Sequence, residues 1–140
     1  MDVQIEILAV VLATISSFVV GFVWYAAPVF GNTWMKLVGL KESDIKMGPG
    51  TSAWFRTVLA AALQAFVLAH VTYLSYSFFD YSWMEAALST AFWLWLGFQL
   101  SMVMTHDAFE QRPLKLTMLN AAHQLATLLV MGIVIGLFKP

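Results

Sequence analysis

The chain has 140 residues, of which 61% are hydrophobic and 11% are charged, whereas soluble domains average roughly 45–50% and 25%. A soluble chain of this length could not hide so much apolar surface in one core, so composition predicts a single transmembrane domain over residues 1–140. The net charge of −1 excludes a basic surface for nucleic acid, and the absence of cysteine excludes disulfides and thiolate metal sites.

Four apolar segments are long enough to cross a hydrocarbon core of roughly 30 Å, which takes about 20 helical residues. None of them alternates with period two, and unpaired backbone is costly in lipid, so they are predicted to be helices and not barrel strands. They cover residues 5–25, 53–77, 84–105 and 114–138. The sequence therefore predicts an all-α integral membrane four-helix bundle.

The first span carries a ridge of small residues, Ala13, Ser17 and Gly21, at successive steps of four, which lets another helix come close. Trp24 and Tyr25 follow at its end. Such residues form either the walls of a site or an aromatic belt at the membrane boundary, and the belt is the commoner use.

A short apolar helix is predicted over residues 33–38, with Asn32 or Thr33 as its cap and Gly39 as its stop. Since it is too short to cross, we expect it to lie in the membrane interface. A polar loop then leads to the second span, which carries Gln64 about halfway along.

Ser82 and Glu85 form a capping-box pattern that opens the third span. The fourth span closes with Gly132 and Gly136, a GxxxG pair suited to a close helix contact. Because small-residue ridges occur on more than one face, we expect a homo-oligomer, with a dimer as the default symmetry.

The basic residues predict the orientation. Six of the seven lie on or beside the first and third loops, and only Lys139 lies on the opposite side: Lys36, Lys41, Lys46, Arg56, Arg112 and Lys115. Cytoplasmic loops are enriched in Lys and Arg. We therefore expect a multi-pass membrane protein with both termini outside.

Polar residues from different spans are predicted to share one depth. Gln99 lies thirteen residues before the turn at Arg112, and His123 and Gln124 lie eleven and twelve after it. At about 1.5 Å per residue these positions are level within a few ångströms. Asn120 lies on the same helix face as His123, nearer the cytoplasm. The predicted polar intramembrane site contains Gln64, Gln99, Asn120, His123 and Gln124.

A cytoplasmic mouth is predicted above this site, formed by Trp24, Tyr25, His106, Asp107, Glu110 and Arg112. His106 and Glu110 have the i, i+4 spacing of metal ligands, with His123 as a third candidate. However, His106 and His123 differ in depth by about 7 Å at 1.5 Å per residue. We therefore predict a solvated cluster paired with Arg112 and Lys115, and neither a metal nor a cofactor.

Three functions compete for the polar site. The first is a transporter- or channel-like protein for a proton, small cation or small solute. Polar side chains inside a membrane are energetically costly and tend to line pathways, and histidine exchanges protons near neutral pH. The alternative is a membrane scaffold or accessory subunit whose polar residues only bond helix to helix. A lipid-modifying enzyme is the third and least favoured function. No nucleophile–base pair or phosphate loop stands out in the sequence, so no catalytic residue is predicted.

Two motifs resemble the domain of unknown function 1761 family of small bacterial membrane proteins. The first is Gly21-x-x-Trp24-Tyr25 followed by Phe30-Gly31-x-x-Trp34-Met35-Lys36-Leu37, and the second runs from Phe109-Glu110-x-Arg112-Pro113-Leu114-x-Leu116 through Leu119-Asn120-Ala121 to His123. In the family pattern a proline follows the Trp-Tyr pair after one residue, whereas here Ala26 and Ala27 precede Pro28. The resemblance implies a four-helix membrane protein of the bacterial plasma (inner) membrane and carries no established activity.

Overall fold

The structure of the chain is a computed structural model that describes residues 3–46, 48 and 50–140. The side chain of Lys46, which enters the orientation argument, and residues 1–2 of the predicted domain lie outside the described part. Within that part the regular elements are all helices, and no strand is present. The all-α prediction is therefore confirmed.

The helices follow one another with short connections. They are α1 (Ile7–Trp24), the π-helical turn η1 (Ala27–Gly31), α2 (Asn32–Val38), α3 (Glu42–Lys46), α4 (Thr51–Phe78), α5 (Trp83–Leu94), the π-helical turn η2 (Trp95–Leu100), α6 (Ser101–Phe109) and α7 (Leu114–Leu137). In the described part, four helical stretches are long and apolar enough to cross a membrane: α1, α4, α7 and the continuous stretch Trp83–Phe109.

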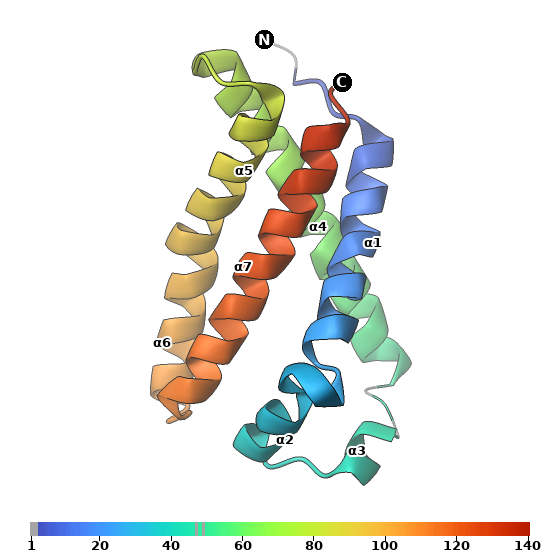
Figure 1. Cartoon of the computed structure of the whole chain (residues 1–140), viewed down its shortest axis with the longest axis vertical. Helices are drawn as coiled ribbons and strands as arrows, with labels where there is room; N and C mark the ends of the chain where they lie inside the picture. The colour runs from blue at the N-terminus through green and yellow to red at the C-terminus, as the bar shows by residue number, and fades with distance from the viewer. Residues whose placement is uncertain (1–2, 47, 49) are drawn as a thin grey trace.

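These four stretches form a bundle with both chain ends at one end of it (Figure 1). Packing runs from α1 to α7, from α7 to α5, from α5 to α4 and from α4 back to α1, so that neighbours are antiparallel. The predicted four-helix bundle is confirmed. The connection between α1 and α4 and the turn between α6 and α7 lie at the opposite end (Figure 1).

Small side chains form much of the core. Ala13 of α1, Ala65 of α4 and Ala87 of α5 are fully buried and belong to one cluster with Leu68 and Met131. Because small side chains let helix backbones approach, close packing holds these spans together. The capping box of Ser82 and Glu85 is present in full at the start of α5, as predicted.

The two glycines at the end of α7 face α5 within the same chain. A Cβ added to Gly132 would lie 3.2 Å from the carbonyl oxygen of Ala87 and 3.2 Å from the Cβ of Ala91. A Cβ added to Gly136 would meet the side chain of Met84. This face is therefore used by an intrachain helix contact.

Two tryptophan side chains bond the third span to α7. The indole N–H of Trp83 donates to the carbonyl of Ile135, and that of Trp95 donates to the carbonyl of Ala121, each at 2.8 Å. The two bonds lie at opposite ends of the α5–α7 contact. They fix the register of the two helices against sliding.

The first connection differs from its prediction in how α2 begins. Asn32 is the first residue of α2 and makes no side-chain cap, so the predicted cap by Asn32 or Thr33 is wrong. The reason is that η1 runs directly into α2 through Gly31 with helical φ and ψ, and no free helix start remains to be capped. Gly39 ends α2 with φ +81°, which confirms the predicted stop.

The bundle is closed toward the chain ends and open toward the other end. Buried residues of α4 begin only at Ala61, and α6 has none. Figure 1 shows α4 crossing behind α7, so that its first turns and α6 lie on opposite sides of the view. Beneath α1 at this end lie α2 and α3 (Figure 1).

Candidate functional site

His123 of α7 lies against the aromatic pair at the end of α1. Its ring centroid is 4.9 Å from that of Tyr25 and 5.8 Å from that of Trp24. The ridge of small residues on α1 permits this approach, because Ala13 and Ser17 are buried there and Gly21 has no side chain. The histidine is half-buried in a mixed aromatic and polar environment.

Polar contacts extend this cluster along α7. The hydroxyl of Tyr25 donates to the side-chain oxygen of Asn120 at 3.4 Å, which ties the end of α1 to α7. The hydroxyl of Thr127 donates to the carbonyl of His123 at 2.9 Å and lies 3.4 Å from the Nε2 atom of the imidazole. One turn of α7 on each side of His123 therefore contributes to the cluster.

Trp24 carries an unsatisfied donor beside the imidazole. Its Nε1 atom is buried and has no hydrogen-bond partner among the described residues. Its ring packs on Phe30 of η1 with centroids 4.6 Å apart. Buried N–H groups are nearly always paired in folded proteins, so an orphan of this kind is a feature of functional or hydrated sites.

A large cavity adjoins His123. It has a volume of about 940 Å³, and it lies between α1, α4, α7 and the connection from η1 to α3; we call it the α1–α4–α7 cavity. Gln64 of α4 and His123, Gln124 and Thr127 of α7 line its inner part. Small-molecule sites have volumes of this order, with mainly apolar walls and a few polar groups that converge.

The connection after α1 forms the opposite wall of the cavity. A Cβ at Gly31 would lie 2.3 Å from the carbonyl oxygen of Tyr25, so the turn closes this tightly only with glycine. The turn brings Trp34 of α2 to the Tyr25 ring, edge to face, with centroids 5.2 Å apart. Trp34 and Met35 of α2 and Ile45 of α3 then line the cavity.

An aromatic side chain of α4 completes the wall. The ring centroid of Trp54 lies 6.4 Å from that of Phe18 and 6.4 Å from that of Phe22, and all three side chains line the cavity. The N-terminal half of α4 contacts α1 through these rings, whereas its C-terminal half contacts the core.

The structure brings together most of the predicted polar intramembrane site. Gln64, His123 and Gln124 line one cavity, and Asn120 is linked to it through Tyr25. Gln99 does not line this cavity; it lies half-buried in η2.

The residues predicted for the cytoplasmic mouth fall into two groups. Trp24 and Tyr25 contact His123, as described above. His106, Asp107, Glu110 and Arg112 lie instead at the turn between α6 and α7, and His106 is exposed. None of these four lines the α1–α4–α7 cavity.

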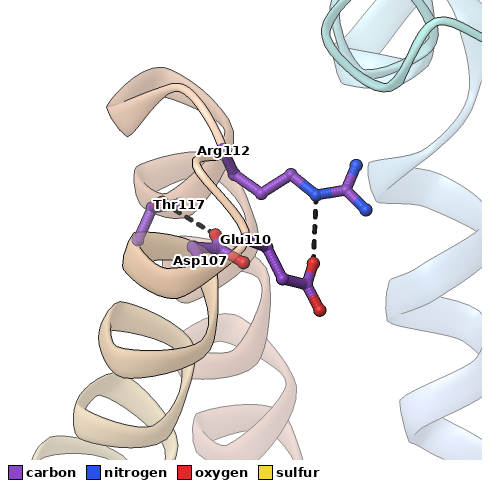
Figure 2. Close-up of polar contacts among 4 residues, drawn as sticks. All are labelled: Asp107, Glu110, Arg112 and Thr117. Atoms are coloured by element: carbon purple, nitrogen blue, oxygen red, sulfur yellow. Dashed lines mark hydrogen bonds and ion pairs between the residues drawn. The ribbon is translucent and has the colours of Figure 1, made fainter.

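The turn between α6 and α7 has its own polar contacts (Figure 2). The hydroxyl of Thr117 donates to Asp107 at 2.7 Å, and the Nε atom of Arg112 pairs with Glu110 at 3.1 Å. The backbone N–H of Arg112 donates to the carbonyl of Asp107, and Gln111 between them has φ +55°. Across the described residues, no group of three or more His, Asp and Glu side chains is arranged to hold a metal ion.

Several cavity residues were not predicted as site residues. Trp34, Trp54, Glu42 and Asp44 all line the cavity. A signal for two of them is present in the sequence, because Glu42 and Asp44 follow the apolar helix with Trp34 by only a few residues. Acidic residues this close to a short apolar helix are the signal that could have placed this segment at a site.

The comparisons with known proteins agree with the resemblance seen in the motifs. No curated protein and no solved structure matches the chain significantly. The family model for Protein of unknown function (DUF1761) matches residues 8–136, which include all four long helices except the first residue of α1 and the last of α7. The chain therefore belongs to the DUF1761 family.

Proposed function

We propose that the protein binds a small amphipathic solute in the α1–α4–α7 cavity and passes it across a bacterial plasma membrane. The observation that carries this proposal is the convergence of Gln64, His123 and Gln124 on one cavity of about 940 Å³. Polar side chains inside a membrane are costly and typically mark substrate pathways or proton relays.

The cavity suits a solute with both apolar and polar parts. Its rings offer apolar contact, and its amides and imidazole offer hydrogen bonds at the inner end. His123 adds an imidazole, a side-chain type that can take up and release a proton, which is what coupling of solute movement to a proton requires. A purely apolar occupant would leave these polar groups unpaired.

The cavity ends where the core begins. Ser17, Gln64 and Thr127 are among its innermost residues, and beyond them Ala13, Ala65 and neighbouring side chains pack closely. Transport therefore requires α1 or α4 to shift against α7 and open the second side. Such an opening is a shear movement of packed helices.

The proposal includes the orientation with both termini outside and the homodimer expected from the sequence. Support for the orientation comes from the basic residues of the first and third loops, which lie at the end opposite the termini. Since Gly132 and Gly136 face α5 of the same chain, a dimer would use other surfaces.

Binding in detergent, followed by flux in proteoliposomes, tests the proposal. The purified protein is melted with a panel of cationic, zwitterionic and anionic aromatic solutes, and those that raise the melting temperature are tested for uptake into proteoliposomes. His123→Ala and Gln64→Ala should abolish both effects. Gln99→Ala is the matched control, because Gln99 lies in a span but outside the cavity. Absence of any stabilising solute contradicts the proposal.

The alternative is a scaffold or accessory subunit, and one observation favours it. The α6 helix has no buried residue, and Phe98, Met102 and Met104 of this region are all more than half exposed. A partner helix could cover this surface. Photo-crosslinkers placed at Met102 and Met104 in native membranes would capture one defined protein if this function is correct, and only lipid if it is not.

A further inference from the structure

Two carboxamides line the inner part of the α1–α4–α7 cavity. They belong to Gln64 of α4 and Gln124 of α7, and in the described part of the chain neither forms a hydrogen bond or an ion pair with another residue. The end of a glutamine side chain carries an acceptor oxygen and an NH2 donor side by side. Each of the two amides therefore offers an adjacent donor and acceptor to a solute in the cavity.

The hydroxyl groups of the inner part are already engaged within their own helices. That of Ser17 donates to the carbonyl of Thr14 at 2.7 Å, and that of Thr127 donates to the carbonyl of His123 at 2.9 Å. A hydroxyl has a single proton to donate. Hydrogen bonding to a solute at this end is therefore left to the two amides and the imidazole of His123.

The part of the cavity built by the spans differs in charge from its end at α3. Among the described residues of α1, α4 and α7 that line the cavity, none is Asp, Glu, Lys or Arg. Glu42 and Asp44 line it from α3, outside the spans, and Asp44 accepts a hydrogen bond from the backbone N–H of Lys41. A charged group inside a membrane is costly unless a partner compensates it. The inner part of the cavity is therefore matched to an uncharged solute.

Aromatic side chains form two walls of the cavity. Phe18 and Phe22 of α1 pack with Trp54 of α4 on one wall, and the rings of Tyr25 and Trp34 meet edge to face on the other. Aromatic rings prefer offset-stacked and edge-to-face neighbours, which favours a flat aromatic body between such walls.

We propose that the solute of this cavity is a neutral, planar aromatic compound with a lactam edge, in which a ring N–H lies beside a ring carbonyl. The proposal rests on the proposed function, because it assigns the chemical class of the bound solute. The lactam N–H donates to the amide oxygen of Gln64 or Gln124, and the NH2 group of the same amide donates to the lactam carbonyl. Glutamine forms a two-bond pair of this kind with the edge of a nucleobase. A cavity of about 940 Å³ accommodates several fused rings.

Four tricyclic probes of similar shape test the lactam edge. Phenanthridinone carries the lactam, N-methylphenanthridinone lacks its donor, phenanthridine lacks both the N–H and the carbonyl, and N-methylphenanthridinium is a cation. Each is titrated by equilibrium dialysis against the purified full chain in detergent, with empty micelles subtracted. Phenanthridinone should bind at least about tenfold more tightly than each of the other three, because they leave amide groups of the site unpaired.

A double variant tests whether the amides provide this selectivity. Gln64→Met with Gln124→Met removes both carboxamides at similar side-chain length, and should reduce the ratio between phenanthridinone and its N-methyl derivative to about twofold or less. A clash of the methyl group with the wall would instead keep the ratio high and overturn the assignment. Gln4→Met with Gln99→Met is the matched control, because neither residue lines the cavity, and it should leave the ratio unchanged.

The melting temperature and the helical circular dichroism spectrum verify that these variants fold. If the double variant does not fold, the comparison of the four probes on the unmodified chain still decides the proposal.

A second set of variants tests the rings. Trp54→Leu should weaken binding of phenanthridinone at least about threefold, whereas Trp54→Phe should weaken it less, because phenylalanine retains an aromatic face. Trp93→Leu is the control, since Trp93 lies outside the cavity. Equal binding by Trp54→Leu and the unmodified chain contradicts the stacking role.

The outcomes separate this inference from the proposed function. Equal binding of phenanthridinone and either neutral analogue, tighter binding of the cation, or a charged solute of the earlier panel as the best stabiliser overturns the lactam assignment while the cavity remains a binding site. If none of the four probes and no solute of the panel binds, both proposals are overturned.

Discussion

The Cβ position of Gly21 lies 3.8 Å from the Nε2 atom of His123, so the imidazole occupies the space that a side chain on α1 would fill. Gly21→Ala should therefore be tolerated, since a methyl group at this distance makes ordinary van der Waals contact. Gly21→Leu should displace His123 and cost about 1–3 kcal/mol, as overpacking does. Thermal unfolding in detergent measures the cost, and loss of solute binding in Gly21→Leu but not in Gly21→Ala measures the displacement.

Gly31 controls the position of α2. Gly31→Ala would place a methyl carbon 2.3 Å from the carbonyl oxygen of Tyr25, so η1 must open and α2 must leave the cavity wall. Hydrogen exchange over residues 32–38 should rise while the long helices stay protected. Gly97→Ala is the control, because its added methyl meets nothing within 4 Å. Unchanged exchange in Gly31→Ala would contradict the role of the turn.

The indole of Trp95 is predicted to stabilise the bundle by its hydrogen bond to Ala121. Trp95→Phe should lower the free energy of unfolding by about 0.5–1.5 kcal/mol for the bond, with more lost from packing. Trp93→Phe is matched in chemistry, and because Trp93 is 63% exposed its effect should be much smaller. Equal losses in the two variants would show that the bond contributes nothing.

A substitution at Gly132 tests whether this glycine face makes a contact within one chain or between two copies. Gly132→Leu should separate α5 from α7 and lower the unfolding free energy by about 2 kcal/mol or more, because Ala87 and Ala91 leave no room. Unfolding in a titration of sodium dodecyl sulfate measures this. If sedimentation instead shows a changed oligomeric state with unchanged stability, the glycine face serves association between copies.

Asp107 and Glu110 are predicted to contribute differently to the free energy of unfolding, although both lie at the same turn (Figure 2). Asp107 accepts a 2.7 Å bond from the buried Thr117, so Asp107→Ala should cost about 1.5–3 kcal/mol, as loss of a bond to a charged group does. Glu110 pairs with Arg112 in the open, and Glu110→Ala should cost less than about 1 kcal/mol. The reverse order in thermal unfolding would contradict this assignment.

The spans could be predicted because their length and apolarity are imposed by the bilayer thickness, and a local property of the sequence is enough to find them. The convergence of Gln64, His123 and Gln124 could be predicted for a related reason. Each lies on a regular helix, where counting residues gives both depth and face.

Gln99 did not follow the same argument, because depth and face do not say on which side of α7 the third span packs. It packs on the face of α7 that carries Gly132 and Gly136, and no residue of Trp83–Phe109 lines the α1–α4–α7 cavity. The cavity wall formed by α2 and α3 was missed because η1 redirects the chain, and no simple periodicity indicates a π-helical turn.

The two indole hydrogen bonds of the third span separate the bundle into a rigid part and a less constrained part. With Trp83 and Trp95 each bonded to a backbone carbonyl of α7, two antiparallel spans become one stiff frame. No indole bond of this kind joins α4 to α1 or α5 among the described residues, and the first turns of α4 carry no buried side chain, whereas its far end is bonded through Tyr76 to Lys139. In the proposed transport, the first half of α4 would therefore be the part that swings against that frame.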